Sequence, residues 1–285
     1  MAATTLVSKI EDIAGDFSGR LSVSARNLTT GERLGLREAE VFPALSTIKL
    51  GIMAELFYRV EEGQPSLSDK VVIQASDLRG GTGVFREFDT PVEVTVKDVC
   101  MMMIVVSDNT CTWLLGDMLG ITSINERMRS LGLKEYSLNS DLGPTMFKDF
   151  EQGGKGVEAY SECSARDLTK LVTLMATGKL VSESASAQML DMMGRCQHVD
   201  WLGRYLPLNP YAAELGIAPE VRLYNKLGAG LHARCDAGLI TTPNASYAIT
   251  VMTADSDDPS RILSSHEGSR AIGRVSAQVY KAWGG

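Results

Sequence analysis

The stretch PALSTIKLGIMAEL, residues 43–56, places a serine and a lysine three residues apart at the start of an apolar helix. At this spacing Ser46 and Lys49 share one face of the helix. A serine hydroxyl becomes an effective nucleophile when a base takes its proton, and a neutral, partly buried lysine can be that base. The free N–H groups of a helix N-terminus can also stabilise an oxyanion. Taken alone, the pair is better explained by a capping serine followed by a snorkelling lysine, since S-x-x-K is a weak pattern.

Two further groups of polar residues have the types that acyl transfer needs. Ser107-Asp108-Asn109 interrupts an apolar stretch, which places three polar side chains where a helix should stay buried. Asp108 or Asn109 can cap the next helix, but that leaves Ser107 unexplained. Lys226 lies on a predicted strand and is followed by small residues, so the backbone of a ligand could approach it closely.

In this order and on these element types, the S-x-x-K, S-D-N and K-L-G motifs resemble the signature of class A β-lactamases and penicillin-binding proteins. The resemblance covers nearly the whole chain from about residue 20. It implies a serine hydrolase that acts through an acyl-enzyme on an amide, lactam or ester bond of a small molecule. No cofactor is implied.

The resemblance assigns roles to four catalytic residues. Ser46 would be the acylated nucleophile, and Lys49 its proton acceptor or relay. Ser107 would pass a proton to the leaving group, and Lys226 would lower the pKa of Ser107.

The resemblance also implies a substrate-binding set. Asn109 would hold the amide side chain of the substrate. The backbone N–H groups of Ser46 and Ala229 would form the oxyanion hole, with Gly228 of the third motif immediately before Ala229.

Two positions depart from the family pattern where the substrate carboxylate would bind. Leu227 stands where the family carries a Thr or Ser hydroxyl, and an unpaired polar group against it would cost about 1–3 kcal/mol. The family's supporting arginine precedes a glycine on the next strand. Alignment on Gly238 puts Ala237 there, with Asp236 beside it and Arg234 offset. A carboxylate-bearing β-lactam is therefore expected to be a poor natural ligand.

The group that would activate the deacylating water is left open. Class A enzymes use a glutamate in an E-x-x-L-N stretch, and Glu135 to Asn139 match that pattern. The match lies closer to Ser107 than the family's loop normally begins, so we interpret it as coincidental. Asp141 is a rival, and Glu151 and Glu158 are further alternatives.

Strand patterns occur near both ends of the chain. Residues 21–36 alternate apolar and polar positions around Thr30-Gly31, which predicts a hairpin. Residues 221–230, 236–243 and 246–255 read as three more strands separated by Gly, Pro and Asn.

The middle of the chain is predicted to be helical. Apolar periodicity predicts helices over 48–60, 94–106 and 109–119. Capping signals at Ser123 and Ser164 predict two more helix starts, the first helix stopping at Gly132. An amphipathic helix is expected over 265–283, and 137–163 reads as one long irregular loop.

These elements predict an α/β (α+β) architecture with the β-lactamase-like fold. An antiparallel sheet built from both termini is flanked by helices, and an all-helical domain is inserted between its strands. The expected boundaries are 1–45 plus 215–285 for the sheet domain and 46–214 for the mainly helical domain. The active-site cleft should lie between them, with specificity set by loops 79–90, 137–163 and 229–237.

Charge and composition exclude several classes of partner. Lys and Arg total 28 against 35 Asp and Glu, a net charge of −7, so nucleic acid is a poor partner. The sequence contains no apolar run of roughly 18 residues, so we expect no membrane span. The start of the chain lacks a signal-peptide pattern, so we expect a cytoplasmic protein, or a periplasmic or secreted one if a leader was removed. The oligomeric state is not predicted.

The cysteines and histidines lack metal-binding spacing. The five cysteines show no C-x-x-C pattern, and the three histidines are dispersed. We therefore expect neither a disulfide framework nor a metal site.

Two alternatives to the leading hypothesis remain. One is a true class A β-lactamase that hydrolyses antibiotics. The other is a non-catalytic penicillin-binding or sensor module that keeps only the shape of the site. The identity of the substrate cannot be read from the sequence.

Overall fold

The computed structural model describes residues 2–138, 161–212, 214–260 and 264–285. Its main feature is a five-stranded antiparallel sheet in the order β2-β1-β10-β9-β8. The strands are β1 (Arg20–Asn27), β2 (Arg33–Leu36), β8 (Arg222–Ala229), β9 (Arg234–Thr241) and β10 (Ser246–Ala254). The sheet therefore combines the two ends of the chain, which confirms the predicted fold class and hairpin.

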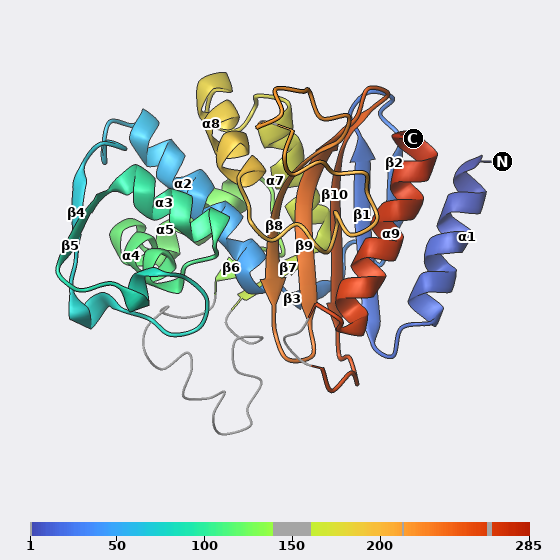
Figure 1. The fold of residues 1–285 in the computed structure, drawn as a ribbon, viewed down its shortest axis with the longest axis horizontal. Coiled ribbons are helices and arrows are strands. Elements are labelled where there is room, and N and C mark those ends of the chain that lie inside the picture. Colours follow the sequence, from blue (N-terminus) through green and yellow to red (C-terminus); the bar gives the residue numbers. More distant parts are fainter. Residues whose placement is uncertain (1, 139–160, 213, 261–263) are drawn as a thin grey trace.

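Helices cover both faces of this sheet (Figure 1). Helices α1 (Ala2–Gly15) and α9 (Glu267–Trp283) pack against each other and enclose one apolar cluster with the sheet. Helix α7 (Ala165–Ala176) contacts β1, β9 and β10 and belongs to the second cluster. Two separate cores thus hold the sheet rigid between layers.

The helical half surrounds one buried helix, α2 (Lys49–Glu61). Its residues from Lys49 to Phe57 are all buried because other helices contact it on several sides. Those neighbours are α3 (Val96–Val105), α4 (Asn109–Leu119), α5 (Ile121–Ser130) and α8 (Glu183–Gly194). A helix buried on all sides holds the groups at its N-terminus in a fixed position.

Short elements connect the layers. Three 3-10 turns are described: η1 (Leu45–Ile48), η2 (Ala75–Asp77) and η3 (Phe85–Glu87). Strands β4 (Lys70–Ile73) and β5 (Val92–Thr95) form a two-stranded sheet. Strands β3 (Val41–Pro43), β7 (Ser161–Ser164) and β6 (Ser137–Leu138) form a three-stranded sheet. The predicted loop over 137–163 is therefore wrong at both ends, and its middle, 139–160, lies outside the described residues.

Two helix starts differ from prediction. The capping box at Ser123 is wrong, because α5 begins earlier, at Ile121. Gly120 caps it with φ +78, a left-handed conformation that lets the chain turn directly from α4 into α5. Helix α9 begins at Glu267 with His266 as its cap rather than at residue 265.

Helix α1 had no sequence prediction, although its apolar residues follow helical spacing. Leu6, Ile10 and Ile13 are buried in the cluster shared with α9. In the part of the chain that is described, no helix is both long enough and apolar enough to span a bilayer.

A buried carboxylate joins α2 to α5. Glu55 is 1% exposed, and its two oxygens accept hydrogen bonds from Arg59 and Arg127 at 2.8 Å each. Arg127 also donates to Glu62 at 2.6 Å and lies over the Tyr58 ring. This network fixes the orientation of the helix that carries Lys49.

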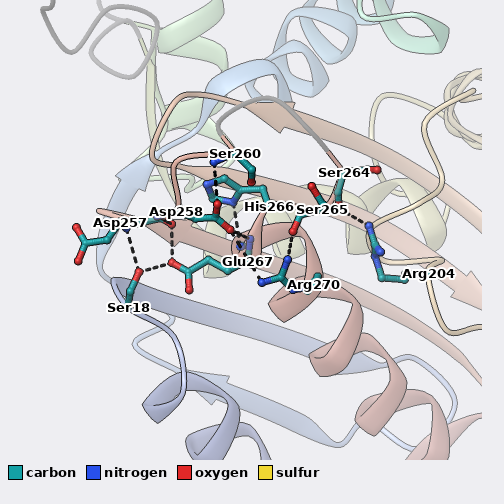
Figure 2. Close-up of polar contacts among 12 residues, drawn as sticks. Ser18, Arg204, Asp257, Asp258, Ser260, Ser264, Ser265, His266, Glu267 and Arg270 are labelled. Atoms are coloured by element: carbon teal, nitrogen blue, oxygen red, sulfur yellow. Dashed lines mark hydrogen bonds and ion pairs between the residues drawn. The ribbon is translucent and has the colours of Figure 1, made fainter.

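Polar contacts fix the connection from β10 to α9 (Figure 2). The Asp258 carboxylate accepts the backbone N–H groups of Ser260 and Glu267 at 2.8 and 2.7 Å. The Ser256 hydroxyl donates to Glu267 at 2.6 Å, and the Ser256 N–H donates to the His232 carbonyl at 3.0 Å. The turn between β8 and β9 is thereby held against the N-terminus of α9.

Candidate active site

The turn that carries Ser46 is held by its backbone. Leu45, immediately before Ser46, has φ +53, which is uncommon for a non-glycine residue. Strand β7 supports this conformation: Ala44 N–H donates to the Ser161 carbonyl at 2.9 Å, and the Ser161 hydroxyl donates to the Leu45 carbonyl at 3.3 Å. The Tyr136 hydroxyl donates to the Ile48 carbonyl at 2.7 Å. Ser46 itself is half-buried.

Lys49 connects this turn to the second motif. Its side chain is 3% exposed, and Nζ contacts the Ser107 carbonyl at 2.7 Å, Ser107 Oγ at 3.0 Å and Asn109 Oδ1 at 2.9 Å. Three oxygen partners satisfy the three protons of an ammonium. In the neutral amine one position is a lone pair, which can accept a proton from a hydroxyl.

The second motif occupies the junction between α3 and α4. Ser107 has φ +58 and is buried, and Asp108 caps α4 by accepting the Cys111 N–H at 3.1 Å. The capping role proposed for Asp108 or Asn109 thus belongs to Asp108. The left-handed conformation directs both the hydroxyl and the carbonyl of Ser107 to Lys49.

The third motif lies on β8, the edge strand beside η1. A Cβ atom at Gly228 would lie 2.6 Å from the Ser46 nitrogen, so only glycine allows the strand to approach so closely. Lys226 is fully buried, and its Nζ donates to the Leu227 carbonyl at 2.7 Å. Ala229 is exposed at the end of the strand.

Burial lowers the pKa of both lysines, and the charge of Lys226 lowers that of Lys49 further. Desolvation, and then the charge of Lys226, hold the pKa of Lys49 well below its usual range, although Asp108 opposes the shift. Burial lowers the pKa of Lys226 to about 8, against the opposing effect of Cys196 and Asp236. A lysine with a lowered pKa can act as a base near neutral pH.

The structure therefore brings most of the predicted site residues together. Lys49, Ser107 and Asn109 form one hydrogen-bonded group, and Gly228 lies against the Ser46 backbone. A serine, a buried amine and a second hydroxyl in this arrangement can attack a carbonyl and move its proton to a leaving group.

Leu227 and Arg234 lie where the sequence departs from the family pattern. Leu227 belongs to the apolar cluster on the α9 side of the sheet, whereas the neighbouring Gly228 faces Ser46. Arg234 pairs with Ala229 on β9 and is fully buried, its Nη1 donating to the Gly230 and Ala233 carbonyls. An arginine thus lies beside the end of β8. Strand register shows where this arginine lies, which alignment on Gly238 gave only as offset.

Glu135 lies on the surface. Its backbone N–H donates to Asp167 at 2.7 Å, just before the short strand β6. The ionisable groups that act on Lys49 are Lys226, Asp108 and Cys111. Asp141, Glu151 and Glu158 lie outside the described residues.

All five cysteines are free and buried. Among the described residues, no group of three or more His, Cys, Asp or Glu side chains could hold a metal ion.

Comparison with known proteins agrees with this geometry. The family model described as "Beta-lactamase enzyme family" matches residues 5–283. The chain belongs to this β-lactamase family. It is 29% identical over 256 residues to β-lactamase L2 of Stenotrophomonas maltophilia, covering 89% of this chain and 78% of the relative.

Solved structures of similar proteins superpose on nearly the whole chain. A β-lactamase from Sphaerobacter thermophilus has a TM-score of 0.82 at 25% identity, covering 98% of this chain and 97% of that one. PBP-A has a TM-score of 0.81 at 26% identity, with 98% and 96% covered. Family and fold together make this chain a β-lactamase-like serine hydrolase.

Sequence reasoning placed loop 79–90 at the edge of the site but did not predict that this loop holds the second motif. The Asp108 carboxylate accepts the N–H groups of Val84 and Phe85 at 2.6 and 3.0 Å. Asn109 Nδ2 donates to the Gly80 carbonyl at 2.9 Å. The glycines of this loop were a signal: Gly83 has φ +123, and a Cβ there would lie 2.3 Å from the Asp108 carboxylate.

Proposed function

We propose that this protein cleaves an amide, lactam or ester bond of a small molecule through an acyl-enzyme on Ser46. The observation that carries the proposal is the position of the buried Lys49 amine, within 3.0 Å of the Ser107 hydroxyl and three residues after Ser46. Burial lowers its pKa, which makes the neutral amine easier to form and lets it act as a base.

The proposed reaction starts with attack of Ser46 Oγ on the substrate carbonyl carbon. Lys49 Nζ takes the hydroxyl proton, and Ser107 passes a proton to the leaving nitrogen or oxygen as its bond to carbon breaks. Lys226 supports this transfer by its positive charge. The backbone N–H groups of Ser46 and Ala229 would bind the oxyanion, and Asn109 would bind an amide side chain.

A second candidate is a penicillin-binding protein that acylates and then releases product slowly. It is favoured by the similarity to PBP-A, whose L158E mutant has been solved as an acyl-enzyme complex with penicillin-G. For the present chain, the exposed position of Glu135 supports the interpretation that its sequence match is coincidental.

Intact-protein mass spectrometry tests these proposals. The protein is incubated with a fluorophosphonate and, separately, with penicillin-G, and Ser46→Ala is the control. A transient penicillin adduct on Ser46 means hydrolysis, and a persistent one means acylation without turnover. Absence of any adduct, or hydrolysis by Ser46→Ala equal to wild type, refutes the acyl-enzyme. Nitrocefin turnover well above background would favour the antibiotic β-lactamase.

A further inference from the structure

Thr82 contacts the second motif at two points. Its hydroxyl donates to the Ser107 carbonyl at 2.7 Å, and its own carbonyl accepts the Asn109 N–H at 3.0 Å. These two bonds bracket the Ser107–Asp108 peptide from the side of the glycine-rich loop. Thr82 comes from a segment that is 25 residues away in sequence from Ser107.

The peptide that Thr82 brackets is strained. Ser107 has φ +58, a conformation that a non-glycine residue keeps only when its surroundings enforce it. The benefit of this conformation is that the Ser107 carbonyl faces Lys49 Nζ at 2.7 Å. The same oxygen therefore accepts from both Lys49 and Thr82, using its two lone pairs.

We propose that Thr82 is a positioning residue, which fixes the Ser107 carbonyl on Lys49 and so keeps the amine aligned for proton transfer. The proposal rests on the proposed function, in which Lys49 takes the proton of Ser46. Without the Thr82 hydroxyl, the Ser107–Asp108 peptide keeps, among the described residues, only the bond from Lys49 to its carbonyl and the bond from the Asp108 N–H to the Met102 carbonyl at 3.1 Å, so it can tilt out of its strained conformation. Lys49 then loses one of its three oxygen partners.

The electrostatic consequence has a definite sign. Lys49 faces Lys226 from β8, Asp108 from the N-cap of α4, Cys111 from α4, and the oxygens of Ser107 and Asn109. A carbonyl oxygen stabilises the ammonium, so its departure lowers the pKa of Lys49 further. The acid limb of the pH–rate profile for acylation should therefore move to lower pH.

Thr82 is exposed, so it can be replaced without opening the core. Thr82→Val removes the hydroxyl at nearly constant shape, and Thr82→Ser retains a donor. Thr177→Val is the matched control, because Thr177, the C-cap of α7, is also exposed and donates to the Thr173 carbonyl at 2.8 Å. Each variant is measured by Ser46 acylation with the fluorophosphonate from pH 5 to 9, by thermal melting and by crystallography.

Thr82→Val should slow acylation about fivefold to tenfold, a loss typical of one hydrogen bond. Its acid limb should shift downward, and its melting temperature should stay close to that of wild type. Thr82→Ser should recover the wild-type rate within about twofold, and Thr177→Val should match wild type. In crystals of Thr82→Val, the Ser107 carbonyl should move away from Lys49 Nζ.

The proposal is overturned if Thr82→Val acylates at the wild-type rate with an unshifted pH profile, or if Thr177→Val slows acylation equally. It is also overturned if Ser107 keeps its position in the crystal structure of Thr82→Val. Failure of wild type to acylate at Ser46 refutes the proposed function instead. In that event the crystal structure alone decides whether Thr82 holds Ser107.

Discussion

Asp236 is a fully buried carboxylate next to the catalytic strand. It pairs with Leu227 across β8 and β9 and is 0% exposed. Its oxygens accept from the Asn225 amide at 3.0 and 3.2 Å and from the Leu202 N–H at 3.1 Å. Burial raises the pKa of Asp236 to about 7, because desolvation outweighs these bonds and the attraction of Lys226. This carboxylate should make stability depend on pH.

The sign follows from which state holds the proton. Between pH 3.8 and about 7, the native state retains the proton on Asp236 while the unfolded chain has released it. The stabilising contribution is therefore complete below the unfolded pKa and declines as pH rises, levelling off above about 7. Integration of proton linkage from pH 5 to pH 8 gives a loss of roughly 2–3 kcal/mol in the free energy of unfolding.

Asp236→Asn removes this titration while keeping the side-chain shape. Urea unfolding of wild type and variant at intervals from pH 5 to 8 gives the difference in unfolding free energy at each pH. Wild type should lose roughly 2–3 kcal/mol relative to Asp236→Asn over this range. A constant loss from imperfect packing of the amide cancels in this comparison. Asp117→Asn, which removes an exposed carboxylate on α4, is the control.

The reasoning is refuted if the difference between wild type and Asp236→Asn stays constant within about 0.5 kcal/mol from pH 5 to 8. A slope of opposite sign would mean that the Asn225 and Leu202 donors stabilise the carboxylate more than burial destabilises it. An equal slope change in Asp117→Asn would mean that general charge, rather than the buried site, sets the pH dependence.

Three further predictions concern the base, the loop and the helical half. Lys49→Ala should slow Ser46 acylation at pH 7 by on the order of 10²–10⁴-fold, measured by mass spectrometry, and a wild-type rate would exclude its role as base. Gly83→Ala should lower both melting temperature and acylation rate, since its Cβ would lie 2.3 Å from the Asp108 carboxylate. Gly63→Ala, at φ +102 with no atom within 4 Å, isolates the cost of backbone strain, and an equal loss there would contradict the clash. Glu55→Gln should lower the free energy of unfolding, measured by urea titration, by roughly 2–3 kcal/mol. This loss is smaller than that expected for a fully buried ion pair, because both arginine partners are partly exposed. A change below about 0.5 kcal/mol would show that solvent replaces those ion pairs at no cost.

Local signals in the sequence were sufficient for most of the fold. The alternation around Thr30-Gly31 and the three C-terminal strands are confirmed, since strand periodicity and turn residues act over a few positions. The Ser164 cap is also confirmed by its bond from the Asp167 N–H. The error at Ser123 arose because Gly120 supplied a competing local signal.

The site was predictable as a set of residue types but not as a network. Ser46, Lys49 and Lys226 could be singled out because their spacing and order resemble a known family. The contact of Thr82 with Ser107 and the place of Arg234 beside Ala229 could not, because each depends on strand register or on a turn packing against a distant segment.

By itself, the sequence determined which side chains are present and which local elements carry them. The spacing of the serine, lysine and glycine residues in the three motifs follows from the sequence. The helical spacing of the apolar residues that are buried in α2 follows from it as well. Only the tertiary structure decided that Lys49 meets Ser107 and Asn109, which lie 58 and 60 residues away. It also decided that Lys226 and Asp236 are fully removed from solvent. The physical reason is that burial and long-range contacts set the pKa values and the strain at this site, and both arise only when the layers pack together.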